Sequence, residues 1–159
     1  MSIDGTDFLL AMNYWDKYYS YKFKKSGLRY EVGLNIITGD ICWWHGPYEP
    51  GMWNDLMIFR DVLMGDLPPG ERVEADKGYK GEAATYVNCP PFETPDRVAM
   101  AKRMRLRHET CNKRFKQWNI LKAPYRHDLY EHQSVFGAIA CLTQIAFEND
   151  EPLFQVDYF

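Results

Sequence analysis

Two β-rich runs separated by a tight turn constrain the fold of this chain most strongly. The runs, Tyr30–Ile37 and Asp40–His45, flank Thr38-Gly39, and glycine supplies the positive φ that a tight hairpin turn requires. The preceding residues 2–11 are short, partly apolar and strand-like. We therefore expect the first 45 residues to contain three consecutive strands of an antiparallel meander.

A capped helix and a further short strand follow the meander. Asn54 or Asp55 can cap a helix that runs to about Leu67, where a Pro-Pro-Gly sequence stops it. Residues 72–75 then form a short strand, which delivers Asp76 at its end. The prolines and polar residues that follow indicate a loop.

Two longer helices complete the expected secondary structure. One covers residues 95–118, with proline at its first position. The other covers residues 133–147 and is apolar on nearly all sides, which places it in or against the core. The order of elements predicts a mixed α/β fold, in which a further strand extends the meander and helices cover the faces of the sheet.

Size and composition favour one packed domain over residues 1–159, of which 46% are hydrophobic. No apolar run is long enough to span a bilayer, and the first residues do not resemble a signal peptide, so we expect a soluble, intracellular protein. The four cysteines contain no Cys-x-x-Cys pair. We expect reduced thiols, three of them in apolar surroundings, and no zinc site: Cys42, Cys89, Cys111 and Cys141.

Charge is distributed unevenly along the chain, although the net charge is only −3. Ten Lys or Arg residues and a single acid, Glu109, lie between Arg97 and Arg126. Five bases lie between Lys17 and Arg29. Such concentrated basic stretches can present a nucleic-acid-binding face in a protein that is acidic overall; the alternative is a solvated helix surface.

Three acids stand out by their positions: Asp4 in the first strand, Asp76 at the end of the fourth, and Glu109 in the basic helix. Strands one and four can be adjacent in a mixed sheet, so these carboxylates can meet. Two divalent cations about 4 Å apart would relieve their repulsion and promote phosphodiester cleavage. Alternatively, the two aspartates are turn residues and the glutamate pairs with Arg105 and Lys113, each one helical turn away.

Sequence blocks around these acids resemble a known family. Ile3–Asp7, Asp76–Tyr79 and Arg107–Lys116 are similar to the three signature blocks of DDE superfamily endonucleases. The nearest resemblance is to the PIF/Harbinger-like group, which is related to bacterial insertion-sequence transposases. Further similar segments bring the resemblance to almost the whole chain: Gly33–Ile41, Gly46-Pro47, Trp53–Arg60 and Pro152–Phe154.

The resemblance implies an RNase H-like fold and a transposase catalytic domain that cleaves DNA and transfers its strands. It implies that Asp4, Asp76 and Glu109 are both the catalytic and the metal-binding residues. Two ions are implied, Mg²⁺ with Mn²⁺ possible, in accord with hard oxygen ligands. The implied partners are DNA at transposon ends, a separate Myb-like DNA-binding protein and a second copy of the chain; the implied location is the nucleus.

The basic helix has the pattern that such a site needs. Arg105, Glu109, Asn112 and Lys116 share one helical face, which would place a carboxylate beside groups that bind phosphates. Lys77, next to Asp76, is a further candidate DNA contact, or else a solvated lysine. The opposite face is expected to pack on the sheet through Met100, Met104, Cys111, Phe115 and Trp118.

Other candidate residues receive more ordinary interpretations. Asp7 lies at an odd offset from Asp4, on the other side of the strand, and is expected to be structural. The Tyr/Lys-rich residues 14–25 could contact an unpaired DNA strand, although a half-buried strand and loop is favoured. His127 and His132 have a spacing that could suit a metal, but surface or capping histidines are favoured.

The chain departs from the family pattern at its start. The N-terminal DNA-recognition domain is expected to be absent, and only three residues precede Asp4, so the first strand is expected to be weakly held. This leaves an alternative: a domesticated or truncated, catalytically inactive, transposase-derived DNA-associated adaptor. A metal-free hydrolase with an acid/base carboxylate pair is disfavoured because it does not explain the basic helix.

Overall fold

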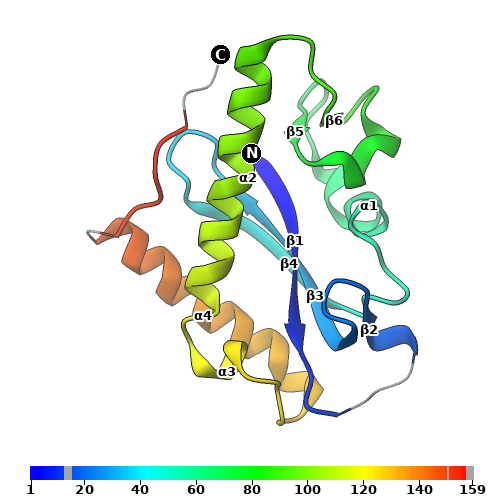
Figure 1. The fold of residues 1–159 in the computed structure, drawn as a ribbon, viewed down its shortest axis with the longest axis vertical. Helices are drawn as coiled ribbons and strands as arrows, with labels where there is room; N and C mark the ends of the chain where they lie inside the picture. The colour runs from blue at the N-terminus through cyan, green and yellow to red at the C-terminus, as the bar shows by residue number, and fades with distance from the viewer. Residues whose placement is uncertain (13–15, 150, 157–159) are drawn as a thin grey trace.

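The computed structural model describes residues 1–12, 16–149 and 151–156 and contains a six-stranded mixed sheet with helices on its faces (Figure 1). The strands β1 (Ser2–Leu9), β3 (Lys25–Leu34) and β4 (Ile41–Tyr48) form an antiparallel meander with β3 in the middle. The predicted meander is therefore confirmed, although β3 begins at Lys25 rather than at Tyr30.

The turn between β3 and β4 is longer than the sequence predicted. It spans residues 35–40, and the side chain of Asn35 accepts hydrogen bonds from the backbone N–H groups of Ile37 and Thr38. Gly39 has a φ of 85°, as expected from its place in the turn. The polar side chain of Asn35 thus closes the turn and ends the strand pairing earlier than the β-rich composition suggested.

Short parallel strands extend the meander on the β1 side. The strand β5 (Val73–Glu74) pairs in parallel with β1, at Ser2 opposite Glu74, and β6 (Val87–Asn88) pairs in parallel with β5. The strand β2 (Tyr19–Ser20) pairs with the start of β3. The sequence did not reveal β6, because two residues within a loop-like stretch give no alternating pattern.

The first strand is anchored along its length, which corrects the expectation that it is weakly held. Every residue from Ser2 to Leu9 is in register with β3. On the other edge, the backbone N–H of Glu74 donates a hydrogen bond to the carbonyl of Met1. Pairing on both edges fixes the strand immediately before Asp4.

The helices begin where the capping residues predicted. Asn54 caps α1 (Asp55–Ile58), which continues as the π-helical turn η2 (Phe59–Leu63) and the 3₁₀ turn η3 (Met64–Asp66). Thr94 caps α2 (Pro95–Phe115). The remaining helical elements are η1 (Asp16–Tyr18), η4 (Lys77–Glu82), α3 (Asn119–Lys122), η5 (Leu129–Glu131) and α4 (His132–Glu148).

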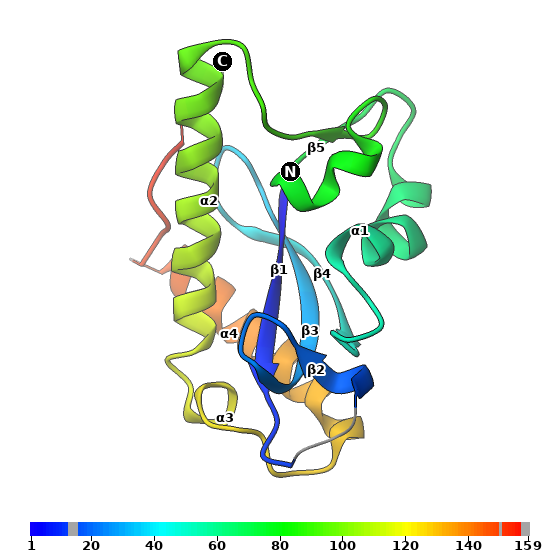
Figure 2. The same ribbon diagram turned by 45° about the vertical axis from the view of Figure 1, so that its right-hand side comes forward.

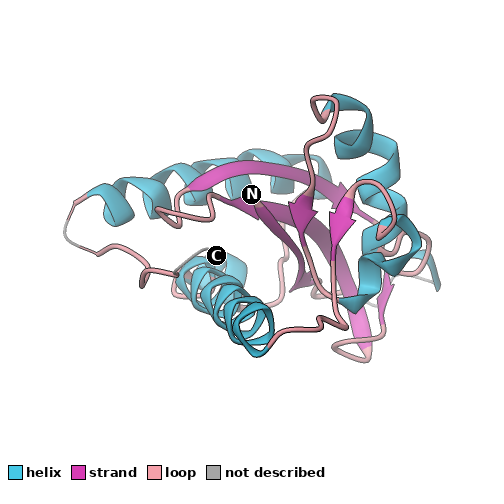
Figure 3. Cartoon of the chain, turned by 90° about the horizontal axis from the view of Figure 1, so that it is seen from above, coloured by secondary structure: helices cyan, strands magenta, loops and turns pink. Residues whose placement is uncertain are grey.

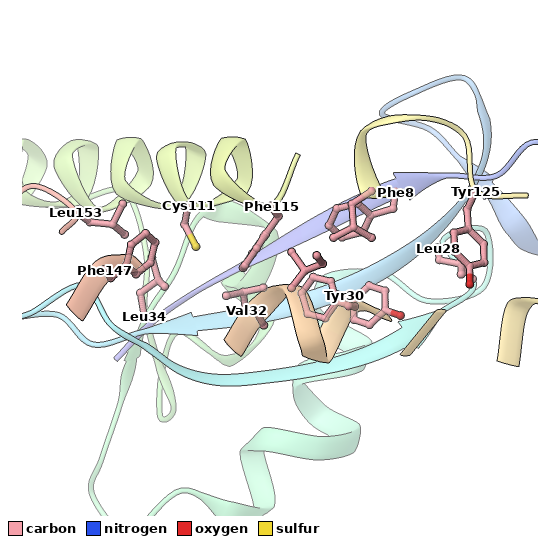
Figure 4. Packing of buried hydrophobic residues seen from close by; sticks show 14 of the residues in the cluster. Phe8, Leu28, Tyr30, Val32, Leu34, Cys111, Phe115, Tyr125, Phe147 and Leu153 are labelled. Carbon is pink, nitrogen blue, oxygen red and sulfur yellow. The ribbon is translucent and has the colours of Figure 1, made fainter. Parts of the chain in front are cut away.

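Helices cover both faces of the sheet, as seen from above in Figure 3. The helices α2 and α4 pack on the face that presents Tyr30 and Val32, and Figure 4 shows Phe115 of α2 over this core. Against the opposite face, Phe59 of η2 and Tyr79 of η4 pack with Ile3 and residues of β5 and β6. This mixed α/β architecture confirms the predicted class and is compatible with an RNase H-like fold.

Two side-chain predictions need correction. Trp118 does not complete the apolar face of α2, since the helix ends at Phe115 and Trp118 is 42% exposed. His132 is buried in the core, where its ring stacks on Tyr30 and its Nδ1 lies 2.8 Å from the tyrosine hydroxyl. His127 is exposed, as predicted.

The cysteine prediction holds in part. All four cysteines lie in the described part of the chain and are free thiols. Only Cys111 is buried, because Cys42 and Cys141 occupy outward-facing positions of a strand and a helix. Within the described ranges, no helix is long and apolar enough to cross a membrane.

Candidate active site

The three predicted acids reach one cavity of about 380 Å³ at the place where β1 and β5 separate. Asp4 comes from β1, Asp76 follows β5, and Glu109 projects from α2. The two strands pair at a single position, Ser2 opposite Glu74. Beyond this pair, the cavity lies between the residues that follow in each strand. Figure 2 shows α2 and α1 on opposite sides of β1, and residues of both helices line this cavity.

Asp4 lies in the most strongly perturbed environment of the three. Its burial, followed by the nearby negative charge of Asp55 and then Asp76, raises the pKa of Asp4 to about 7 against the opposing charge of Lys22. Asp76 is exposed, and its carboxylate accepts a hydrogen bond of 2.6 Å from the backbone N–H of Gly78. Asp76 therefore also acts as the cap of η4, which is the turn chemistry that the sequence left open.

Asp55 is a fourth acid in the cavity, and the sequence did not identify it as one. A Cβ atom at Gly5 would collide with its carboxylate, and a Cβ at Gly78 would lie 4.0 Å from Asp55 Oδ2 and 2.9 Å from Asp76 Oδ1. Gly5 thus allows the Asp55 carboxylate to approach β1, and Gly78 leaves room for the carboxylate of Asp76. The position of Asp55, directly after Asn54, fits a helix cap, and this pattern does not reveal that its carboxylate lines a cavity.

An arginine that lines the same cavity forms an ion pair with Asp55. Arg29 of β3 donates two hydrogen bonds to Asp7, of 2.8 and 3.1 Å, and its Nη1 lies 3.2 Å from Asp55 Oδ1. This second contact is an ion pair without hydrogen-bond geometry, and Asp55 Oδ1 is buried with no hydrogen-bond partner. Burial raises the pKa of Asp55, and the charge of Arg29 opposes the shift.

Asp7 also lines this cavity, but it is buried and both of its carboxylate oxygens accept hydrogen bonds. In addition to the bonds from Arg29, it accepts a hydrogen bond of 2.5 Å from the Ser20 hydroxyl. It faces the α1 side of the sheet with Arg29, its cross-strand neighbour. This arrangement agrees with the structural role expected from its odd offset from Asp4.

Glu109 is exposed, like Asp76, and forms an ion pair within its own helix. Its Oε1 lies 3.4 Å from Arg105 Nε, one helical turn earlier, which is the alternative that the sequence left open. Arg105, Asn112 and Lys116 line the same cavity, so the predicted shared face of α2 is confirmed. Pairing and cavity lining are compatible, because an exposed ion pair of this kind is weak.

Basic side chains surround the acids. Lys22 and Lys113 line the cavity together with Lys116, whose Nζ lies 5.3 and 5.1 Å from the ring centres of Phe8 and Phe23. Burial, and next the charge of Lys22, lowers the pKa of Lys116. The Tyr/Lys-rich stretch thus contributes a lysine to the cavity; its residues Tyr14 and Trp15 lie outside the described residues.

Lys77 does not line the cavity of about 380 Å³ that the three predicted acids reach, which we call the acidic cavity. It lines a second cavity of about 530 Å³, which shares Asp4, Asp76 and Arg105 with the first. The lysine begins η4 and is exposed. Asp76 therefore lines both cavities, whereas Lys77, the next residue, lines the second one.

The donor set suits a divalent cation in its chemistry. Asp4, Asp55 and Asp76 supply carboxylate oxygens, and the charges of Asp55 and Asp76 add to the larger effect of burial in raising the pKa of Asp4. Hard oxygen donors are those that Mg²⁺ prefers. Among residues 1–12, 16–149 and 151–156, however, no group of three or more His, Cys, Asp or Glu side chains is already arranged to hold a metal ion. The fit is therefore one of donor chemistry and charge.

Comparison with known proteins agrees with the geometry. A family model described as DDE superfamily endonuclease matches residues 3–144. The matched range includes both strands and the helix that carry the predicted acids, together with Asp55. No curated protein and no solved structure matched the chain. Since the family model covers most of its length, the chain belongs to the DDE superfamily endonucleases.

Proposed function

We propose that this domain is a metal-dependent DNA endonuclease of the transposase type, of the PIF/Harbinger-like group. The observation that carries the proposal is the cavity at the open edge of β1, where Asp4, Asp76 and Glu109 meet the cations of α2. A phosphodiester substrate needs both kinds of group: carboxylates to hold metal ions at the reacting phosphate, and cations to hold the adjacent phosphates.

Asp4, Asp76 and Glu109 are the residues that we propose hold the ions, with Asp55 as an additional carboxylate. Divalent cations, Mg²⁺ or Mn²⁺ and two of them in the proposed mechanism, would activate the attacking oxygen and stabilise the leaving one. Asp4 and Asp55 fit the role because they lie close to each other and to Asp76, and the negative charges of these neighbours add to burial in raising the pKa of both groups.

The side chains of α2 have a separate task, which is to bind and orient DNA. Arg105 and Lys116 would contact phosphates on either side of the reacting one, and the amide of Asn112 can donate a hydrogen bond between them. Lys77 would contact the strand on the other side of Asp76. Such contacts position the backbone without reading the base sequence.

A second candidate is a transposase-derived protein that binds DNA without cleaving it. The observation in its favour is the exposed ion pair between Arg105 and Glu109, which engages one of the proposed metal-binding carboxylates. Under either proposal the partners are DNA, a separate Myb-like protein and a second copy of the chain, and the location is the nucleus.

Cleavage of supercoiled plasmid distinguishes the two candidates. The endonuclease should nick the plasmid in Mg²⁺ or Mn²⁺, and chelator should abolish nicking. Asp76→Asn and Glu109→Gln should reduce nicking to the chelated level, whereas two exposed acids outside the cavity, changed as Asp66→Asn and Glu93→Gln, should not. Folded protein that binds the plasmid but never nicks it would overturn the catalytic proposal and support the second candidate.

A further inference from the structure

A second cavity, of about 530 Å³, opens beside the acids and differs from the first in its walls. One wall comes from the segment after β6, with Pro91 and Phe92, and the other from α2, with Val98, Ala101 and Met104. The volume is within the range of cavities that enclose small planar ligands. These apolar side chains make up most of the surface of the second cavity, in contrast to the charged lining of the acidic cavity.

The wall at Phe92 is held in place by a buried charge. Glu74 of β5 is 2% exposed and accepts hydrogen bonds of 3.0 and 3.1 Å from Arg97 of α2. The guanidinium of Arg97 in turn lies 4.9 Å from the centre of the Phe92 ring. This chain of contacts joins the sheet, the helix and the aromatic ring, so the cavity wall is fixed before any ligand arrives.

The two cavities meet at Asp4, Asp76 and Arg105, which line both. Lys77 and Lys102 add positive charge to the second cavity. A phosphate held at the acids would therefore place the adjoining nucleoside at an apolar cavity with cations around it. An unpaired nucleobase, planar and largely apolar on its faces, suits such walls.

We propose that this second cavity binds the base of an unpaired nucleotide next to the reacting phosphate of a DNA strand. The proposal rests on the proposed function, because it takes DNA as the substrate. It implies that the domain engages DNA that is unpaired at the cleavage position, since a base within a duplex cannot enter a cavity without leaving its stack. Affinity then has two parts, one from the phosphates and one from the base.

Binding measured without divalent ions separates these parts. Fluorescence anisotropy would compare a single-stranded oligothymidylate with an abasic strand of the same length in chelator. The native domain should bind the strand with bases about tenfold more tightly, the size expected for stacking of one base. Ala101→Trp, which fills the cavity from the helix, should bring this ratio close to one.

Ala99→Trp is the matched control, because Ala99 lies on the same helix, is exposed and does not line the cavity. It should keep the native ratio. Phe92→Ala, which removes part of the opposite wall without adding bulk, should also lower the ratio. Equal ratios in the native domain, Ala101→Trp and Phe92→Ala would overturn the proposal.

Plasmid cleavage in Mg²⁺, run in parallel, shows which proposal has failed. Base discrimination without cleavage would overturn the catalytic proposal alone. Cleavage without base discrimination would overturn the base-binding proposal alone. Failure of the native domain to bind either strand would overturn both.

Discussion

The carboxylate of Asp55, at the start of α1, lies against Gly5 of β1 so closely that a Cβ at position 5 would collide with it. We predict that Gly5→Ala destabilises the domain by about 1–3 kcal/mol, because either the strand or the carboxylate must move. The same displacement should weaken metal-dependent cleavage. Urea unfolding followed by tryptophan fluorescence measures the first effect, and plasmid nicking the second.

Gly65→Ala provides the control for this substitution. Gly65 lies in η3, where an added Cβ would meet no atom within 4 Å. Its replacement should leave stability unchanged or raise it by up to about 1 kcal/mol. In an Asp55→Ala background the cost of Gly5→Ala should shrink, and an unchanged cost there would show that the collision is not its cause.

Arg29 should be among the most sensitive charged residues of the domain. Arg29→Met would leave the buried Asp7 without its partner and Asp55 without its ion pair, and we predict a loss of about 3–5 kcal/mol. Lys17→Met removes an exposed ion pair to Glu49 and should cost much less stability, because solvent screens such pairs. Similar losses for both variants in urea unfolding would contradict the buried role of Arg29.

The pH dependence of stability should carry a contribution from His132. Burial lowers its pKa to about 4, below its ordinary value of 6.5, so the unfolded chain binds a proton more readily than the folded one between these values. Its contribution is present above pH 6.5 and is lost as the pH falls toward 4, by about 3 kcal/mol at most. Measured free energies of unfolding should reflect this loss.

A substitution isolates this histidine from other groups. The pKa values of Asp4 and Glu31 are raised to about 7 and 8, mainly by burial, so these carboxyls stabilise the fold as the pH falls and partly mask the effect. His132→Gln removes the titration and should flatten the loss relative to the native chain. His127→Gln, at an exposed position, should leave the pH profile unchanged, and a variant profile at His132 identical to the native one would disprove the assignment.

Patterns that act locally could be predicted from the sequence. The turn at Gly39, the cap at Asn54 and the shared face of α2 depend on residues that are close in the chain, and all three are present. The pairing of β1 with β5, which brings Asp4 near Asp76, was predicted from element order, and the family resemblance pointed to the same residues.

Contacts between distant segments could not be predicted in this way. The approach of Asp55 to Gly5 is possible because glycine has no side chain between the two elements. No pattern of neighbouring residues in the sequence indicates such a contact. Similarly, His132 was assigned to the surface because a single histidine at a helix start fits a cap. Its burial follows from where α4 crosses the ring of Tyr30, which is a property of packing rather than of spacing.

Lys116 should contribute directly to the salt dependence of DNA binding. Its Nζ lies over the rings of Phe8 and Phe23 at the edge of the acidic cavity, so its charge is held at one position rather than moving freely in solvent. If it contacts one phosphate, Lys116→Met should lower the slope of log affinity against log salt concentration by about one unit, while the methionine keeps the apolar packing.

Lys122→Met removes a charge from α3 outside both cavities and should leave the slope closer to that of the native chain. Anisotropy titrations of a labelled strand over a range of salt concentrations measure both slopes, and equal slopes for the native domain and Lys116→Met would show that this lysine does not contact the DNA backbone.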